Sequence, residues 1–268
     1  MAFVDRYRQQ IQENIPVVYE DLEFHPLTVR DYPLYETARP AFELMLSSLK
    51  DPRLARLPWC GCLWALDKEC EQQTGKPGMF LAWVLCVMAT ALRLDATASG
   101  TFPLRPVFAQ TGELTAIMVG DVQTNYALLN MRQMDDIRQI IAAQNGYDLP
   151  NENWNPELVR AAQENAKRGS TNLDVNFEDL VYSVAFNAHC RASEIYGWTI
   201  REFHKTQEAI DRTLGYVIYS LADKSGFVTY KYGTPYPSWK FNRNADMPVG
   251  FKTISEIDET AHGLLAGL

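Results

Sequence analysis

Short stretches of alternating apolar and polar residues mark the extended parts of this chain. Residues 15–30 alternate loosely, and residues 105–124 place the apolar run 114–119 after the turn sequence Thr111-Gly112-Glu113. Alternation with a period of two puts successive side chains on opposite faces of a strand. Together with the aromatic segment 226–241, these stretches predict small β-hairpins near residues 15–30, 105–124 and 226–241.

Apolar residues recur at helical spacing through most of the remaining sequence. Asp31, followed by Pro33, is a suitable start for one helix, and Asn145-Gly146 is a suitable end for another. The predicted helices cover residues 34–49, 57–71, 77–94, 130–141 and 156–167, and a further helical region begins at Phe177. The expected fold class is therefore α+β, predominantly helical.

Two stretches of small or polar residues interrupt these patterns, at residues 96–100 and 149–155. Such stretches are typical of boundaries between packed parts of a chain. We therefore expect an N-terminal part, residues 1–95, with a hairpin and helices. A central hairpin and helix module, residues 101–148, and a C-terminal helical region with an aromatic hairpin, residues 156–268, complete the predicted organisation.

The charge balance disfavours several classes of partner. The formal net charge is −8 and the isoelectric point is about 5.1, whereas nucleic-acid binding needs a concentrated basic surface. The longest apolar run, residues 79–92, is shorter than the roughly 20 residues that cross a bilayer, so it predicts a buried core helix. Charges scattered through residues 1–14 are unlike a secretory signal. We expect an intracellular protein that binds neither nucleic acid nor membrane.

The sequence offers little that indicates catalysis or metal binding. Its five cysteines are odd in number, and Cys60-Gly61-Cys62 lacks the spacing of a zinc-binding pair. Most of the cysteines lie in apolar surroundings, which favours reduced, buried thiols. None of the four histidines has a carboxylate at a recognised metal or triad spacing. The prediction is a non-enzymatic protein without catalytic residues, metal or cofactor.

Aromatic residues near the C-terminal end are the main candidates for a binding surface. Because Tyr and Trp are enriched at protein interfaces, and because Pro235 and Pro237 stiffen the segment, protein contact is favoured over the stacking of a sugar or a base. Trp198 precedes a helix that Thr199 and Glu202 would open as a capping box, and its ring is expected mainly in the core. The candidate binding residues are Trp198, Tyr230, Tyr232, Tyr236 and Trp239.

Five short segments stand out together, namely residues 27–32, 144–146, 155–159, 196–203 and 225–229. In their order and spacing these segments resemble the tail assembly chaperones of tailed bacteriophages and prophages. The resemblance implies a protein of the host cytoplasm that binds the tape-measure protein and keeps its long hydrophobic helices soluble during tail assembly. It implies no catalytic residue, and it leaves room for other tail proteins as partners and for homo-oligomers.

Three other functions are compatible with the same sequence. A structural tail or neck protein would remain in the assembled particle, whereas a chaperone would be absent from it. A small-ligand enzyme would need converging polar groups around Tyr236 and Trp239. A phage-encoded regulator of host proteins is the third alternative.

Overall fold

The computed structural model describes residues 3–95, 103–121, 125–147, 149, 155, 157 and 176–226. The chain forms two compact units, of which the first comprises Met1–Asn153 and Phe177–Gln207 and the second comprises Trp154–Asn176 and Glu208–Leu268. The boundaries expected near residues 96–100 and 149–155 lie largely outside the described residues, so the three-part division stays a prediction.

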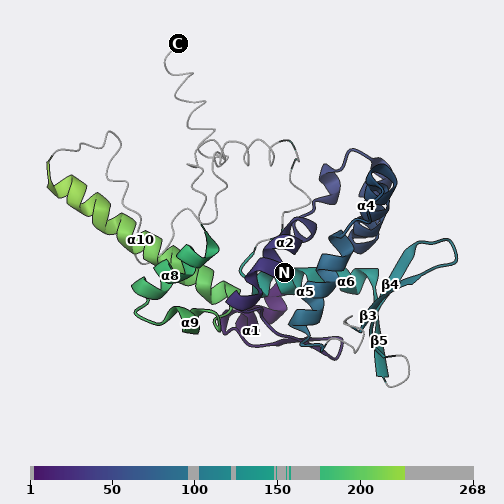
Figure 1. Cartoon of the computed structure of the whole chain (residues 1–268), viewed down its shortest axis with the longest axis horizontal. Helices are drawn as coiled ribbons and strands as arrows, with labels where there is room; N and C mark the ends of the chain where they lie inside the picture. Colours follow the sequence, from purple (N-terminus) through teal and green to yellow (C-terminus); the bar gives the residue numbers. More distant parts are fainter. Residues whose placement is uncertain are drawn as a thin grey trace, which may run out of the picture. The chain divides into compact units, whose positions relative to one another are not determined.

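Helices dominate the described residues (Figure 1). The α-helices are α1 (Arg8–Gln12), α2 (Tyr32–Phe42), α3 (Pro52–Ala55), α4 (Trp59–Thr74), α5 (Phe80–Ala91), α6 (Met131–Gln144), α8 (Phe177–Asn187), α9 (Ala192–Ile195) and α10 (Ile200–Lys224). Three 3₁₀ helices are η1 (Phe3–Tyr7), η2 (Val29–Asp31) and η3 (Leu46–Ser48). Two antiparallel sheets accompany these helices, so the predicted α+β, predominantly helical class is confirmed.

The smaller sheet is the hairpin predicted for residues 15–30. It pairs β1 (Val17–Tyr19) with β2 (Leu22–Phe24). Its two turn residues, Glu20 and Asp21, have φ angles of 51° and 59°, as a type I′ turn requires. Asn, Asp and Gly are the usual residues of such turns, so Asp21 is a common choice and Glu20 is the less usual one.

The larger sheet contains the second predicted hairpin and one strand more. It joins β3 (Leu104–Phe108), β4 (Leu114–Asp121) and β5 (Asn125–Asn130) in the order β3-β4-β5, all antiparallel. Strand β5 ends where Asn130 caps α6, since its side chain accepts from the Gln133 N–H at 3.0 Å. The third hairpin, expected at 226–241, lies outside the described residues apart from Gly226.

The hydrophobic core of the first unit lies among α2, α4, α5 and α6 and the inner faces of both sheets. Helix α5, which the longest apolar run predicted as a core helix, buries Val84, Val87 and Met88. The indole of Trp59 is buried and donates to the Ala41 carbonyl at 2.8 Å. No helix among the described residues combines the length and the apolar character needed to span a membrane.

Helix α2 ends earlier than the apolar pattern predicted. The pattern extended to residue 49, whereas the helix stops at Phe42. The buried guanidinium of Arg138, from α6, donates to the Phe42 carbonyl at 2.7 Å and to the Leu44 carbonyl at 2.8 Å. These carbonyls, at and just beyond the end of the helix, therefore bond to a side chain from elsewhere in the fold.

A close crossing joins α4 to α5. The buried carboxylate of Asp67, on α4, accepts from the N–H groups of Phe80 and Leu81 at 2.8 and 3.0 Å, so it caps the start of α5. The Gly78 N–H donates to the Asp67 carbonyl at 3.3 Å. A Cβ atom on Gly78 would collide with Cα and Oδ1 of Asp67. The approach of the two segments therefore depends on glycine at this position.

Candidate protein-binding surface

Helix α10 begins with the cap that the sequence predicted. The Thr199 hydroxyl accepts from the Glu202 N–H at 3.1 Å, which satisfies one of the free donors of the first turn. The segment before the helix is held by the first unit, because the Ile200 N–H donates to the Leu27 carbonyl at 2.9 Å. Ile200 and Phe203 are fully buried there. The helix therefore starts as a core element.

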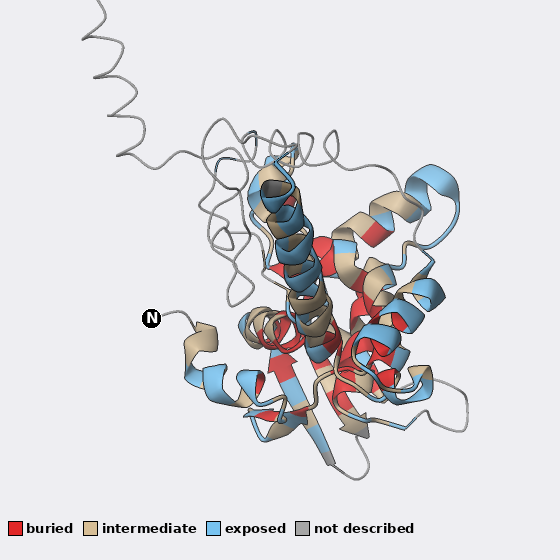
Figure 2. Ribbon diagram, turned by 90° about the vertical axis from the view of Figure 1, so that its left-hand side faces the viewer, coloured by how far each residue is buried: buried red, intermediate tan, exposed pale blue. Residues whose placement is uncertain are grey.

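Its apolar stripe continues beyond the first unit. Apolar residues recur at alternating intervals of three and four, the spacing of one helix face, through Leu214, Val217 and Leu221. These residues and the neighbouring Ile218 are exposed to solvent. The exposed fraction is 49% for Leu214, 45% for Val217, 63% for Ile218 and 64% for Leu221. Leu214, Val217, Ile218 and Leu221 are called the α10 stripe from here on. Figure 2 shows the exposed and intermediate surface along much of α10.

The surroundings of the α10 stripe enlarge its apolar surface. Tyr216 and Tyr219 are each 39% exposed on the same helix. Thr213 and Ser220, which precede Leu214 and Leu221, are small and uncharged. Positions next to an apolar seam often carry charges that select a partner, and these two positions carry none. The stripe thus has the composition of a helix-in-groove anchor, which is read at intervals of three, four and seven residues.

A second exposed apolar surface lies on α8. Tyr182 is 59% exposed and Phe186 is 80% exposed, whereas Val181 and Val184 are buried. The helix is apolar on more than one side, so its packing within the first unit covers only part of its apolar surface. Sequence reasoning did not select α8 or the α10 stripe as binding surfaces. Both helices carry apolar residues in excess of one buried face, but this excess indicates a binding surface only once the buried face is known.

Trp198 has a structural place in the backbone. Its carbonyl accepts from the Val29 N–H at 2.8 Å, beside a bridge between Thr28 and Thr199. Its side chain is half-buried. The residue therefore helps to fasten the start of α10 to the segment before α2, and its part in binding stays a prediction. The other candidates, Tyr230, Tyr232, Tyr236 and Trp239, lie outside the described residues.

One polar cluster has the residue types of an acid–base site. The Tyr147 hydroxyl lies 2.8 Å from the Glu36 carboxylate and 3.0 Å from Nε2 of His204. Burial and the hydrogen bond to Glu36 raise the pKa of Tyr147 well above its usual value. The phenol therefore stays protonated, and its O–H donates a hydrogen bond to the Glu36 carboxylate. The Tyr147 oxygen then accepts from His204 in the tautomer or charge state that carries a proton on Nε2. Arg39 also lies 3.4 Å from Glu36.

The positions of these residues in the fold indicate a structural role for the cluster. Glu36 comes from α2, Tyr147 follows α6 and His204 lies in the first turns of α10. Tyr32 adds a stacked contact with Phe177 of α8, at 4.6 Å between ring centroids. These residues line neither the hollow between α4, α5 and β3 nor the hollow beside β5. The cluster therefore holds four segments of the first unit together. The enzyme alternative stays a hypothesis.

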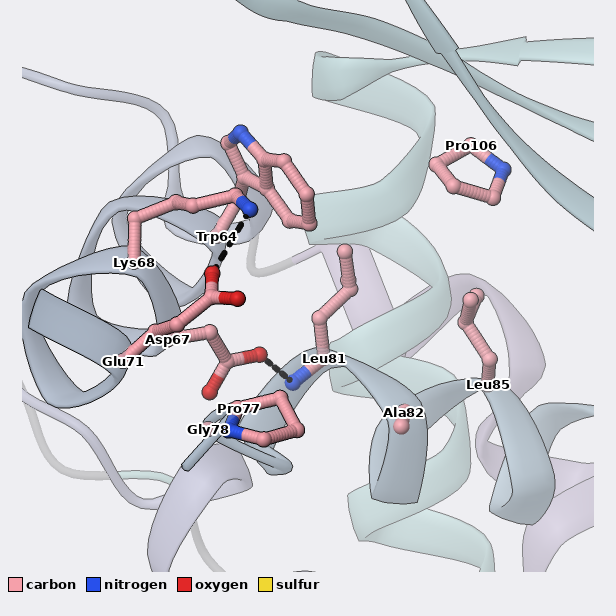
Figure 3. Close-up of a pocket in the computed structure, with 10 residues that line it drawn as sticks. All are labelled: Trp64, Asp67, Lys68, Glu71, Pro77, Gly78, Leu81, Ala82, Leu85 and Pro106. Carbon is pink, nitrogen blue, oxygen red and sulfur yellow. Dashed lines mark hydrogen bonds and ion pairs between the residues drawn. The ribbon is translucent and has the colours of Figure 1, made fainter. Parts of the chain in front are cut away.

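The hollow between α4, α5 and β3 is small (Figure 3). It has a volume of about 190 Å³, less than the roughly 300 Å³ at which ligand pockets usually begin. Its charged groups already interact with one another, because Lys68 Nζ lies 2.8 Å from Glu71 and 4.7 Å from the centre of the Trp64 ring. The Asp67 carboxylate at its edge caps α5. This geometry gives little support to a small-ligand site.

No protein-family model matches this chain. No curated protein and no solved structure matches it either.

The cysteines and the acidic residues of the described segments form no metal cage. Cys60 and Cys62 are buried free thiols, as predicted, whereas Cys70, Cys86 and Cys190 are partly exposed. Burial raises the pKa of the Cys60 thiol far above its usual value and that of Cys62 to about 11. Both thiols are therefore protonated and poorly nucleophilic at neutral pH.

We expect iodoacetamide to spare Cys60 and Cys62 in the folded protein, because neither thiol is accessible or ionised. Mass mapping after alkylation at neutral pH, with and without denaturant, measures this protection. Both cysteines should react once the chain is unfolded. Rapid native alkylation of Cys60 would contradict the packing described for α4.

Proposed function

We propose that this chain is a non-enzymatic protein-binding protein whose α10 stripe receives an amphipathic helix of a partner. The observation that carries the proposal is the exposure of four apolar side chains on one helix, Leu214, Val217, Ile218 and Leu221. Large exposed apolar patches are typical of interaction sites, because the exposure of apolar surface to water is unfavourable and a partner removes it.

Covering the α10 stripe would supply part of the free energy that specific binding needs. Fully burying one such side chain contributes about 1.5–3 kcal/mol, and each of the four is roughly half exposed. Covering the α10 stripe therefore contributes on the order of 4 kcal/mol, before the partner's own apolar residues are counted. A partner helix with apolar residues at matching intervals would bury both stripes together.

The finer proposal is a phage tail assembly chaperone that binds the tape-measure protein in the host cytoplasm. It is supported by the resemblance of residues 27–32 and 196–203, among others, to such chaperones. A long helical protein with hydrophobic faces is also the kind of partner that an exposed apolar stripe fits. Under this proposal the chain covers those faces until the tail-tube subunits replace it.

The test is co-expression of this protein with the longest helical open reading frame of its gene neighbourhood, followed by purification and mass determination of the complex. We expect a soluble complex. Changing both Ile218→Lys and Leu221→Lys should weaken binding at least a hundredfold, because two anchors are lost and charges are introduced into an apolar contact. Circular dichroism should show unchanged folding, since both positions are exposed.

The matched control changes two exposed apolar residues of α8, Tyr182→Lys and Phe186→Lys. This variant loses as much apolar surface but should keep the partner soluble. Equal loss in both variants would refute the α10 stripe as the binding site. An insoluble partner beside free wild-type protein would refute the chaperone proposal. Recovery of this protein from purified particles would favour the structural tail or neck alternative.

A further inference from the structure

Strand β5 is an edge strand with an unusual surface. Its residues, Asn125–Asn130, include no charged residue and no proline. Tyr126 is 52% exposed and Leu128 is 55% exposed, whereas Leu129 is buried against the core. Natural edge strands usually carry charge or proline, which prevents pairing with other chains. This strand carries neither safeguard.

The backbone of β5 is available on its outer side. The strand pairs with β4 from Asn125 to Asn130, and no other described strand pairs with it. Every second residue of an edge strand directs its N–H and C=O groups away from the ladder. The opposite edge of the same sheet differs, because β3 contains Pro106, which has no N–H to donate. The sheet therefore has one open edge and one blocked edge.

A hollow with acidic residues lies beside β5. It has a volume of about 410 Å³ and is lined by Tyr126 and Ala127 of β5, by Val119 and Gly120 of β4, and by Leu22, Leu94, Glu20 and Asp21. Glu20 and Asp21 are both exposed. Neither forms an ion pair with a described cation. Two carboxylates in the rim of this hollow favour an occupant with a positive charge.

We propose that β5 accepts an extended segment of a partner protein as an added strand, and that this segment alternates apolar and basic residues. The apolar side chains of the added segment would lie on the face that carries Tyr126 and Leu128 and would cover these two residues. Successive residues of a strand point to opposite faces. The intervening side chains would therefore point toward the hollow, where Lys or Arg would meet Glu20 and Asp21. Backbone bonds to β5 would supply affinity, as in other cases of strand addition.

Charge decides between such a partner and a second copy of this chain. Each copy has a formal net charge of −8 and carries its own Glu20 and Asp21 beside the edge. Pairing β5 with itself would bring like charges together and would supply no cation to either hollow. A basic segment from another protein gains attraction at the same positions. This interface is separate from the α10 stripe and does not depend on it.

The test uses synthetic peptides and the whole protein. A short peptide of alternating valine and lysine is the probe, a peptide of alternating valine and glutamate is the charge control, and a valine and lysine peptide with alternate N-methylated residues is the backbone control. Binding is measured by titration calorimetry at low salt. Amide hydrogen exchange then locates the bound peptide.

We expect the valine and lysine peptide to bind and to slow exchange in residues 126–129. The glutamate peptide and the N-methylated peptide should bind at least tenfold more weakly, because each lacks one of the two interactions. Changing Glu20→Lys and Asp21→Lys together should reduce binding to a similar extent. Glu113→Lys, in the β3–β4 turn of the same sheet, is the matched control and should leave binding unchanged.

Equal binding of all three peptides, or protection of residues other than 126–129, would overturn the proposal. Absence of binding at millimolar peptide would also overturn it. A dimer of the protein alone that Leu128→Lys dissociates would assign the edge to a second copy. None of these results would change the outcome of the co-expression test, so the two proposals fail independently.

Discussion

Replacing Arg138 with leucine is expected to lower the free energy of unfolding by about 3–4 kcal/mol. The guanidinium is buried and donates to two backbone carbonyls, those of Phe42 and Leu44. It also lies over the Trp59 ring, at 4.9 Å from its centre. Leucine fills part of the space but leaves these carbonyls without their donor, and an unsatisfied buried acceptor is costly. Urea unfolding followed by circular dichroism measures the loss.

Two further substitutions separate the hydrogen bonds from charge alone. Arg138→Lys keeps the positive charge but cannot reproduce the planar fork that reaches both carbonyls, so most of the loss should remain. Arg132→Leu, on the exposed side of the same helix, should change stability by less than about 0.5 kcal/mol. Equal effects of Arg132→Leu and Arg138→Leu would contradict the role given to the buried guanidinium.

The second large effect is expected for Gly78→Ala, with a loss of about 2–4 kcal/mol. The new methyl group would collide with backbone and side-chain atoms of Asp67, and its distance to the Asp67 Cβ would be 2.9 Å. Because a backbone atom is among them, the clash cannot be relieved by turning one flexible side chain. The chain before α5 would have to move, which would lengthen the bonds from Phe80 and Leu81 to Asp67.

A second glycine in the same region provides the control. An added Cβ on Gly61, within α4, would lie 3.6 Å from the Pro58 Cδ, which is an ordinary contact. Since alanine favours helix more than glycine does, Gly61→Ala should stabilise the protein by up to about 1 kcal/mol. Thermal unfolding of both variants should therefore shift in opposite directions. A lower melting temperature for Gly61→Ala than for Gly78→Ala would refute this account of the crossing.

The sequence predicted those parts of the fold that depend on local patterns. Alternation located the first two hairpins, and apolar spacing located α4, α5 and α6. Strand β5 was missed because its short uncharged run leads directly into the cap of α6. The early end of α2 depends on Arg138, which is 96 residues away from Phe42 along the chain. No local pattern contains that contact.

Binding surfaces are harder to predict because exposure is a property of the folded chain. Apolar residues at helical spacing usually indicate a buried face, and at Ile200 and Phe203 they do. The same spacing in the α10 stripe remains exposed, and the sequence does not separate the two cases. Trp198 was selected for its aromatic ring, whereas the contacts that hold it are made by its backbone.

The proline in β3 limits how this protein could assemble. A sheet with two open edges can add one copy after another and grow into a fibre without end. Here Pro106 obstructs the edge opposite β5. Copies of this chain therefore cannot stack through an unbroken ladder with the β5 edge of one against the β3 edge of the next. Growth of one copy on another would need both edges, so this sheet by itself does not build a fibre of the protein.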